Sequence, residues 1–384
     1  MKRVALLGST ALFGAGMMAN TAMAADGIKL GLGGFFRSTY MATFDDDGEG
    51  EPGNDHNTDG IFSNAEVFFT GDTTLDNGLI VGARVELEGE TANDQIDEAY
   101  VHFDGGFGQV RVGSDDEALG GACILPPGGT DNFSAFSPDN WGANTDAITD
   151  AFPALTSNAA CVGVDDHEDA QKIVYYSPNF AGFQLALSYT PNGEAEGQNE
   201  DGGPHIGMPD NLDGESRHNA SVYATYSYAG DGWGMDAGLG GSFEGQVESN
   251  PGPDRDKQQF YQGALNFTFG DFAVGGVFEY YNNLFTLDTG DDIDAWVAGG
   301  GVAYTMDAWT FGAQYSHQLS DVKGSSDEFT MDRAVATAVY ALGPGINVDG
   351  EVGYTWTDVD GDLPGDLDDN YDAWEIGIGT ALTF

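Results

Sequence analysis

Basic residues are scarce in this chain. Its 384 residues contain 12 Lys and Arg against 63 Asp and Glu, so the formal net charge is −51. Binding to nucleic acid needs positive charge opposite the phosphates, and this composition therefore excludes a nucleic-acid-binding protein. An acidic surface attracts cations instead. Adaptation to a salty habitat would explain the same acidity, and both causes can act together.

Long apolar runs are also missing. After residue 24 no stretch reaches the roughly 18 apolar residues that a membrane-spanning helix needs. The first 24 residues combine Lys2 and Arg3 with an apolar run over 4–18 and a small-x-small pattern at 22–24. This pattern predicts a secretory signal peptide at 1–24, with an N-terminal anchor helix as the alternative. Its removal would leave residues 25–384 and change the formal net charge from −51 to −53.

Cysteine is nearly absent. Cys123 and Cys161 are the only two, and both lie in one long connection between predicted strands. Export places them in an oxidising compartment, which favours a disulfide between them. On the chain-entropy model such a bond stabilises the closed loop by roughly 4 kcal/mol. Two free thiols or an intermolecular bridge remain the alternatives. The six histidines show no metal-ligand spacing with these cysteines.

What the chain has instead is alternation of apolar and polar residues. In residues 371–384, Trp374, Ile376 and Ile378 share one parity, whereas Glu375 and Gly377 share the other. Side chains of a strand point alternately to opposite faces, so each such segment has one apolar face. The pattern recurs in more than ten segments. A soluble sandwich would show it too, but the signal peptide and the aromatic residues near segment ends favour a transmembrane β-barrel.

Tight turns fix the expected number of strands. Seven short Gly- and Asp-rich connections, at 72–78, 104–108, 177–182, 230–234, 270–271, 306–307 and 343–345, separate eight hairpins. Eight hairpins predict a 16-stranded antiparallel barrel, uncertain by one hairpin because the parity of residues 295–304 and 334–341 is poorly defined. The remaining connections are acidic and longer.

One connection, residues 114–171, is far too long for a hairpin loop. Loops beyond about 15 residues are usually functional or disordered. This one contains Trp141, several Phe and both cysteines, which favours an ordered segment.

Two motifs around this connection resemble a known family. The segments FGQVRVG (107–113) and VYYSPNFAGF (174–183), with the long third loop between them, are similar to the general porins of Gram-negative bacteria. They are most similar to the alpha-proteobacterial, Rhodobacter-type branch. The resemblance covers essentially the mature chain, and the terminal Phe384 matches the family's assembly signal. It implies a homotrimer in the cell outer membrane, with the third loop folded into each lumen as a constriction.

The resemblance also implies site residues. In the family, carboxylates of the third loop face a row of basic side chains on the barrel wall, which creates a transverse field in the pore. Arg37, Arg84 and Arg111 lie at inward parity and are the expected pore-lining residues. The expected constriction-loop acids are Asp115, Asp116 and Glu117, because they leave the wall nearest Arg111. The alternative for the arginines is a structural one, in which Arg84 pairs with Glu86 or Glu88 within the wall.

We therefore expect an outer-membrane diffusion porin that passes ions and small hydrophilic solutes with a preference for cations. A substrate-selective channel is the first alternative, and a secreted acidic surface or adhesin protein is the second. No Gly-x-Ser-x-Gly nucleophile motif occurs, so an enzyme is not expected.

Expected partners are further copies of the chain, outer-membrane lipid and, through divalent cations, lipopolysaccharide. No cofactor is expected. Weak Ca²⁺ binding to acidic loops is conceivable, but Leu363 occupies the position of the EF-hand glycine in the segment that begins at Asp358, which excludes an EF-hand.

Overall fold

The structure is a computed structural model that describes residues 27–45, 58–89, 96–136, 161, 170–193, 216–247, 256–286, 290–360 and 372–384. The predicted signal peptide at 1–24 lies outside these residues. So do most residues of the acidic connections predicted at 45–59, 194–213, 248–256 and 358–372.

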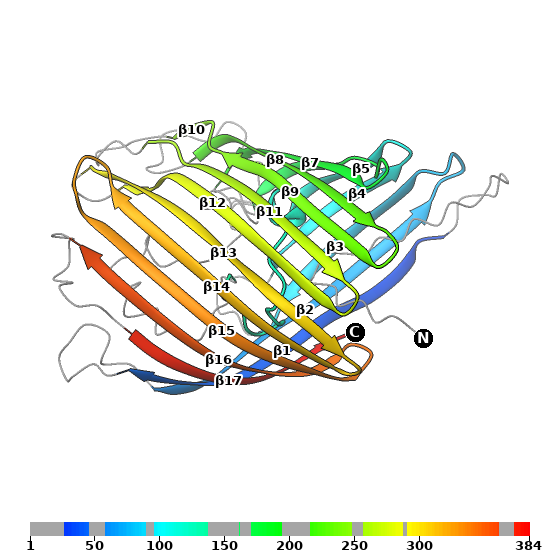
Figure 1. Cartoon of the computed structure of the whole chain (residues 1–384). Coiled ribbons are helices and arrows are strands. Elements are labelled where there is room, and N and C mark those ends of the chain that lie inside the picture. The colour runs from blue at the N-terminus through cyan, green and yellow to red at the C-terminus, as the bar shows by residue number, and fades with distance from the viewer. Residues whose placement is uncertain are drawn as a thin grey trace.

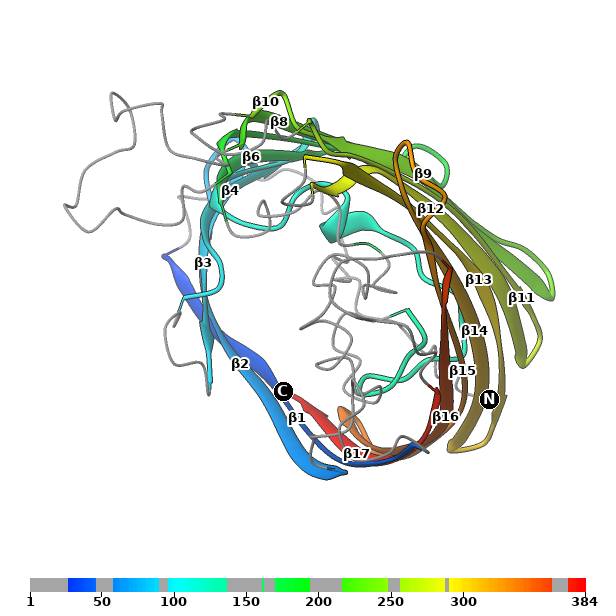
Figure 2. The same ribbon diagram turned by 90° about the vertical axis from the view of Figure 1, so that its left-hand side faces the viewer.

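Seventeen strands form one closed antiparallel sheet (Figures 1 and 2). Consecutive strands pair with one another except at β10, where β9 pairs with β11 instead. The ring closes because β1 also pairs with β17, where Phe36 lies opposite Leu382. The short β10 pairs with β8, as β9 does, so β9 and β10 form one wall strand interrupted at Glu244 and Gly245. The barrel therefore has the sixteen wall strands that the turns predicted.

The elements are β1 (Lys29–Asp45), β2 (Asp59–Thr74), β3 (Ile80–Glu88), β4 (Ala99–Gly105), β5 (Gly108–Ser114), η1 (Gly120–Ala122), β6 (Gln171–Tyr176), β7 (Phe183–Asn192), β8 (Ser216–Ala229), β9 (Trp233–Phe243), β10 (Gln246–Val247), β11 (Gln259–Phe269), β12 (Phe272–Thr286), β13 (Asp292–Met306), β14 (Trp309–Val322), β15 (Glu328–Gly343), β16 (Ile346–Asp360) and β17 (Asp372–Thr383). No helix in the described part of the chain is long and apolar enough to cross a membrane. The seven predicted tight turns coincide with the short connections between these strands, all at one end of the barrel, which we call the turn end.

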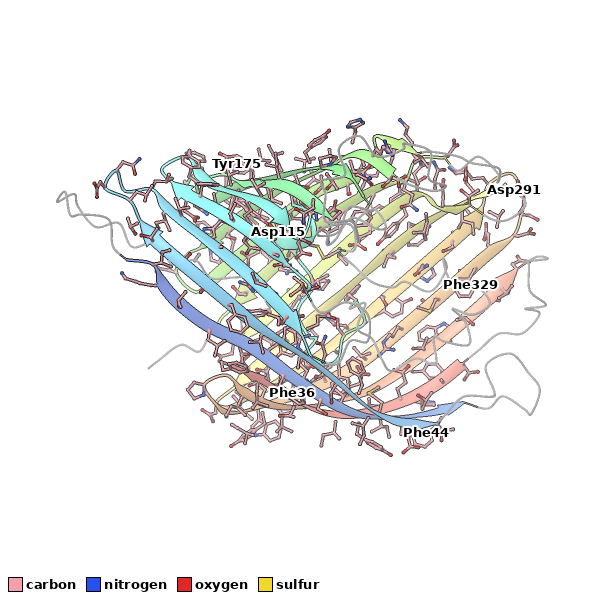
Figure 3. All side chains as sticks on the ribbon, turned by 180° about the vertical axis from the view of Figure 1, so that it is seen from behind. Phe36, Phe44, Asp115, Tyr175, Asp291 and Phe329 are labelled. Atoms are coloured by element: carbon pink, nitrogen blue, oxygen red, sulfur yellow. A yellow bond between two sulfur atoms is a disulfide. The ribbon has the colours of Figure 1, made fainter. Side chains whose placement is uncertain are left out.

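The predicted alternation is confirmed, with the apolar side chains outward. On β17 the side chain of Trp374 is 55% exposed, whereas its neighbour Glu375 is fully buried. Figure 3 shows Phe36 and Phe44 on the outer wall, and both are exposed. An apolar outer face with a polar inner face is the arrangement of a membrane barrel that encloses water.

Outward tyrosines share one contact near the end opposite the turns. The hydroxyl of each bonds a side chain on the next strand, two residues before the cross-strand partner of the tyrosine. The pairs are Tyr40–Asp59 at 2.9 Å, Tyr189–His218 at 2.7 Å, Tyr280–Asp294 at 3.0 Å, Tyr354–Asp372 at 2.7 Å, and Tyr315–Asp332. A ring in lipid with its hydroxyl bonded to a polar group fits the membrane–water boundary.

The inner wall also holds a buried charged triad. Arg333 on β15 lies between Glu351 on β16 and Glu375 on β17, with N···O distances of 3.0 and 2.9 Å. All three side chains are almost fully buried, and the Thr355 hydroxyl also donates to Glu375. A charged group removed from water is stable only with a close counter-charge and hydrogen bonds. Each member of the triad therefore needs the others to remain charged in the buried site.

We expect Arg333→Ala to destabilise the barrel strongly, by about 3–5 kcal/mol, because it leaves two carboxylates buried without their cation. The triple variant Arg333→Met, Glu351→Gln and Glu375→Gln is the matched control. It removes all three charges together and should stay close to the wild-type stability. Urea unfolding in lipid vesicles measures both. Equal stability of the wild type and Arg333→Ala would contradict a mutually dependent triad.

Candidate functional site

The first part of the long third connection lies inside the barrel. Figure 2 looks along the barrel and shows the teal segment 115–136 within the ring of strands. The backbone N–H of Ala118 donates to Ser188 Oγ at 3.1 Å, and that of Leu119 donates to Ser221 Oγ at 2.8 Å. The loop backbone is no longer part of the sheet, so its N–H groups need other acceptors. The hydroxyl groups of these inward serines on β7 and β8 supply them in place of water.

The second part of the loop lies against the opposite wall. Gln314 on β14 donates to the carbonyl oxygen of Pro126 at 3.0 Å, and its own carbonyl oxygen accepts from the N–H of Ala135 at 2.9 Å. Thr337 on β15 donates to Gly128 O at 2.7 Å, and Asn132 donates to Asp349 on β16 at 2.7 Å. The loop thus bridges the lumen between two sides of the barrel.

Glycines on β13 and β14 allow the loop to approach this wall. A Cβ at Gly312 would meet the carbonyl oxygen of Gly128, and a Cβ at Gly301 would meet that of Pro127. On the loop itself, a Cβ at Gly128 would lie 2.6 Å from Val302 O. Backbone oxygens cannot move aside as a flexible side chain can, so glycine is needed on both sides of this contact.

A disulfide joins Cys123 to Cys161, with their Cα atoms 5.8 Å apart. Gln262 on β11 donates to Glu279 Oε1 at 3.1 Å, and the backbone N–H of Cys161 donates to the same oxygen at 3.1 Å. The Tyr223 hydroxyl in turn bonds Gln262. The disulfide end of the loop is therefore attached to the wall at β8, β11 and β12.

The three arginines expected from the sequence all point inward. Arg37 lies over the ring of Phe35 at 4.6 Å, and Arg84 lies over that of Phe68 at 4.2 Å. Arg84 also forms an ion pair with Glu86, two residues along the same strand. Pairing of Arg84 with Glu86 was the alternative to a pore-lining role. The structure shows this ion pair together with an inward-pointing Arg84.

Arg111 has the most extensive contacts of the three. Its guanidinium lies between the rings of Tyr100 and Tyr176, 4.9 and 5.0 Å from their centroids. It forms a 3.0 Å ion pair with Asp115 and donates to Gln109 at 2.7 Å. Figure 3 shows Asp115 within the barrel, and its side chain is only 1% exposed. The first loop carboxylate therefore contacts the arginine directly rather than lying across the lumen from it.

Of the other expected acids, Glu117 is buried and Asp116 is half-buried. The backbone N–H of Asp116 donates to Glu98 at 3.3 Å, and Glu117 accepts from Ser242 on β9 at 2.7 Å. Burial raises the pKa of Asp115 to about 7, although Arg111 favours its charged form. Burial and neighbouring acids likewise raise the pKa of Glu98 to about 8. The negative charge at this neck therefore varies with pH near neutrality.

Sequence reasoning missed other inward charges. Lys172 on β6 is buried and bonds the backbone carbonyl of Asp115, and Arg333 belongs to the triad. The carboxylates of Glu66, Glu86 and Asp97 also gather, with oxygen atoms within 4.8 Å of one another, and Glu86 pairs with Arg84. The inward parity of Lys172, Glu66 and Glu86 was readable from the alternation, whereas Asp97 lies before β4 and outside that pattern. Their partners were not, because they come from other strands or from the loop.

A closed sixteen-stranded barrel with an apolar outer face and a polar segment inside its lumen is the architecture of an outer-membrane channel protein. The chain belongs to the family of Gram-negative porins, whose sequence profile matches residues 8–361. Membership of this family assigns the chain to the outer membrane. Porins of this family are channels and not enzymes, and they generally need no cofactor.

Individual relatives are distant. A monosaccharide porin of a Halomonas species and the major outer membrane protein of Halomonas elongata are each 26% identical over 245 residues, which cover 59% of this chain and 56% of each relative. An anion-selective porin from Comamonas acidovorans has a TM-score of 0.56 at 16% identity, over 93% of this chain and 100% of that one. A mutant porin of Rh. blastica has a TM-score of 0.52 at the same identity and coverage.

We expect Gly312→Ala to push the Pro127–Gly128 segment off the wall and into the lumen, which lowers single-channel conductance. Gly263→Ala on β11 is the matched control, because a Cβ there meets only the flexible Leu239 side chain at 3.6 Å. Planar-bilayer recording of both variants tests the expectation. Conductance equal to that of the wild type in Gly312→Ala would show that this contact does not set the position of the loop.

Proposed function

We propose that the chain is a general diffusion porin, which lets ions and small hydrophilic solutes pass passively through a water-filled lumen and prefers cations moderately. The observation that carries this proposal is the polar loop segment held inside a closed barrel by hydrogen bonds to inward side chains. Such a loop narrows the lumen, and its hydrogen bonds attach it to the wall.

Charge supports the cation preference. The formal net charge is −51, and acids concentrated in a low-dielectric neck raise the local cation concentration. Arg111 and Arg84 act in the opposite direction, but each already has a carboxylate partner, Asp115 and Glu86. Their fields are thereby partly cancelled, which leaves a moderate preference for cations.

A substrate-selective channel remains the second candidate function. It is favoured by one relative, which is named a monosaccharide porin. A saturable sugar flux would distinguish this function from free diffusion.

We expect the triple variant Arg37→Ala, Arg84→Ala and Arg111→Ala to increase both conductance and cation preference, because it removes three positive charges from the neck. The control is Lys29→Ala, Lys257→Ala and Lys323→Ala, which removes the same charge outside the neck and should change both less. Reversal potentials in a salt gradient at about 0.1 M, where the Debye length is about 10 Å, measure the difference. An unchanged reversal potential in the arginine variant would assign those residues to wall structure alone.

We further propose a homotrimer whose contacts form at the low wall, the sector made of β4, β5 and β6. These strands have 7, 7 and 6 residues, whereas a transmembrane strand needs about 9–11. Seven tilted residues rise only about 17 Å, less than the apolar band of about 25 Å. Outward Val101, Val112 and Ile173 are nevertheless exposed in the single chain. Lipid matches this short apolar surface poorly, so neighbouring copies of the chain would cover these three side chains.

Ile173→Arg should therefore yield folded monomers, because a charge at a subunit contact opposes association. Val302→Arg on β13 is the control at a site of similar exposure on a long strand. It should lower the yield of folded protein, by the cost of a charge facing lipid, without splitting the trimers that form. Light scattering in detergent measures the oligomer. Intact trimers in Ile173→Arg would place the contact elsewhere on the wall.

The finer expectations from the sequence belong to the same proposal. The 107–113 and 174–183 motifs support the alpha-proteobacterial branch, whereas the curated relatives come from Halomonas. Phe384 is proposed as an assembly residue, and its backbone exchanges two 3.0 Å hydrogen bonds with Gly34 beside the β1–β17 seam. Weak binding of Ca²⁺ and of lipopolysaccharide by acidic loops is proposed from charge, and most of those loops lie outside the described residues.

A further inference from the structure

The third loop makes a compact turn at residues 130–133, inside the barrel. The hydroxyl oxygen of Thr130 accepts from the backbone N–H groups of Asn132 at 3.1 Å and Phe133 at 2.9 Å. The backbone N–H of Thr130 donates in turn to the carbonyl oxygen of Phe133 at 2.7 Å. These bonds hold the turn together from within, so the side chains of Asn132 and Phe133 leave it in fixed directions.

The ring of Phe133 fills a gap in the inner wall. A Cβ at Gly377 on β17 would overlap both this ring and the Met41 sulfur on β1. Met41 and Gly377 are cross-strand partners, and the Phe133 side chain is only 3% exposed. The ring therefore occupies the space that a side chain at position 377 would take. We call this place, formed by Met41 and Gly377, the seam socket.

Asn132 docks on the wall beside the seam socket. A Cβ at Gly379 on β17 would lie 2.7 Å from Asn132 Nδ2 and 2.8 Å from Thr39 Cγ2 on β1. Asp349 on β16 is the other cross-strand partner of Gly379. Its carboxylate accepts from Asn132 Nδ2 at 2.7 Å and bonds the Thr130 hydroxyl through its second oxygen. The turn is thus docked on three adjacent strands, β16, β17 and β1.

This docking place exists only in the closed barrel. The first and last strands of the chain, β1 and β17, become neighbours when the ring closes. Met41 and Gly377 therefore come from opposite ends of the chain, and the seam socket is absent until these strands pair. Burial of the Phe133 ring against both strands adds apolar contact across the seam. The loop can thus take its final position only after closure.

Docking at the seam also determines which part of the wall faces the water of the lumen. Figure 2 shows the later part of the teal segment beside β15 and β16, where the inward Asp349 and Glu375 are buried. On the other side of the seam, Arg37 and Phe68 are half-buried, and the Arg84 side chain is 25% exposed. We call the inward faces of β1, β2 and β3 around these three residues the open strip.

We propose that Phe133 is a positioning residue of the channel, which fixes the far end of the loop at the β1–β17 seam and keeps the loop away from the open strip. Because Phe133 is buried, it acts through the position of the loop and not through contact with solutes. This inference rests on the proposed diffusion function, since a change in loop position is measured as a change in ion flow.

Phe133→Ala should release the turn. Removal of a buried phenylalanine ring should lower the equilibrium constant for docking by about a hundredfold or more. The released turn then enters the lumen, so single-channel recordings should show repeated steps to a lower current level. Phe133→Leu keeps most of the apolar volume and should restore the steady current of the wild type. Phe311→Ala is the matched control, because it removes the same ring from the outer wall, where Phe311 is 44% exposed.

A double-mutant cycle tests the contact itself. Gly377→Ala fills the seam socket from the opposite side, and it should cause the same current steps because its Cβ and the Phe133 ring cannot share one space. In the double variant with Phe133→Ala, the second substitution should add no further steps, since the ring is already gone. Such non-additivity is the signature of residues in direct contact. Circular dichroism and heat-modifiable migration check that each variant contains a folded barrel.

The outcomes separate this inference from the proposed function. A steady wild-type current in folded Phe133→Ala would overturn the positioning role, and so would equal steps in Phe311→Ala or additive steps in the double variant. If Phe133→Ala does not fold, Gly377→Ala decides: current steps support the role, and a steady current overturns it. Absence of any conductance in the wild type would instead overturn the diffusion function.

Discussion

Backbone hydrogen bonding in lipid is the constraint on which this structure depends. A sheet edge exposed to hydrocarbon would leave its N–H and C=O groups without partners, so a membrane sheet has to close. Here β1 pairs with β2 on one side and β17 on the other, and this seam turns a chain of hairpins into a barrel. Closure also creates the lumen, in which every other functional feature lies.

The lumen changes the chemistry of the residues that face it. Carboxylates such as Glu375 and Asp115 are buried there, yet they meet Arg333 and Arg111 and not a hydrocarbon core. Serine hydroxyls and the Gln314 amide of the wall form hydrogen bonds with the backbone of the loop. Glycines allow the two backbones to come into contact. The interior is therefore a polar network that narrows the pore, while charged groups that remain exposed, such as Asp72, can act on ions in transit.

Much of the fold was readable from the sequence, and the reason is local. Alternation has a period of two residues and tight turns have characteristic residues, so strand faces and hairpins are encoded within short segments. The inward parity of Arg37, Arg84 and Arg111 followed from the same pattern. The cysteine pair was expected because only two cysteines exist and both lie in one loop. The interruption at Glu244 and Gly245 was not expected, since it breaks the alternation on which the prediction relied.

The sequence by itself determined a closed antiparallel barrel, its outer face and the side chains that point into its lumen, because each depends on residues that are neighbours in the chain. Only the tertiary structure decided which inward groups meet. Gly128 contacts Thr337, Arg333 contacts Glu375, and His102 contacts Asp72 across separations of 209, 42 and 30 residues. No repeat in the sequence records such distances, because they arise from the closure of the ring and from the path of the third loop across it.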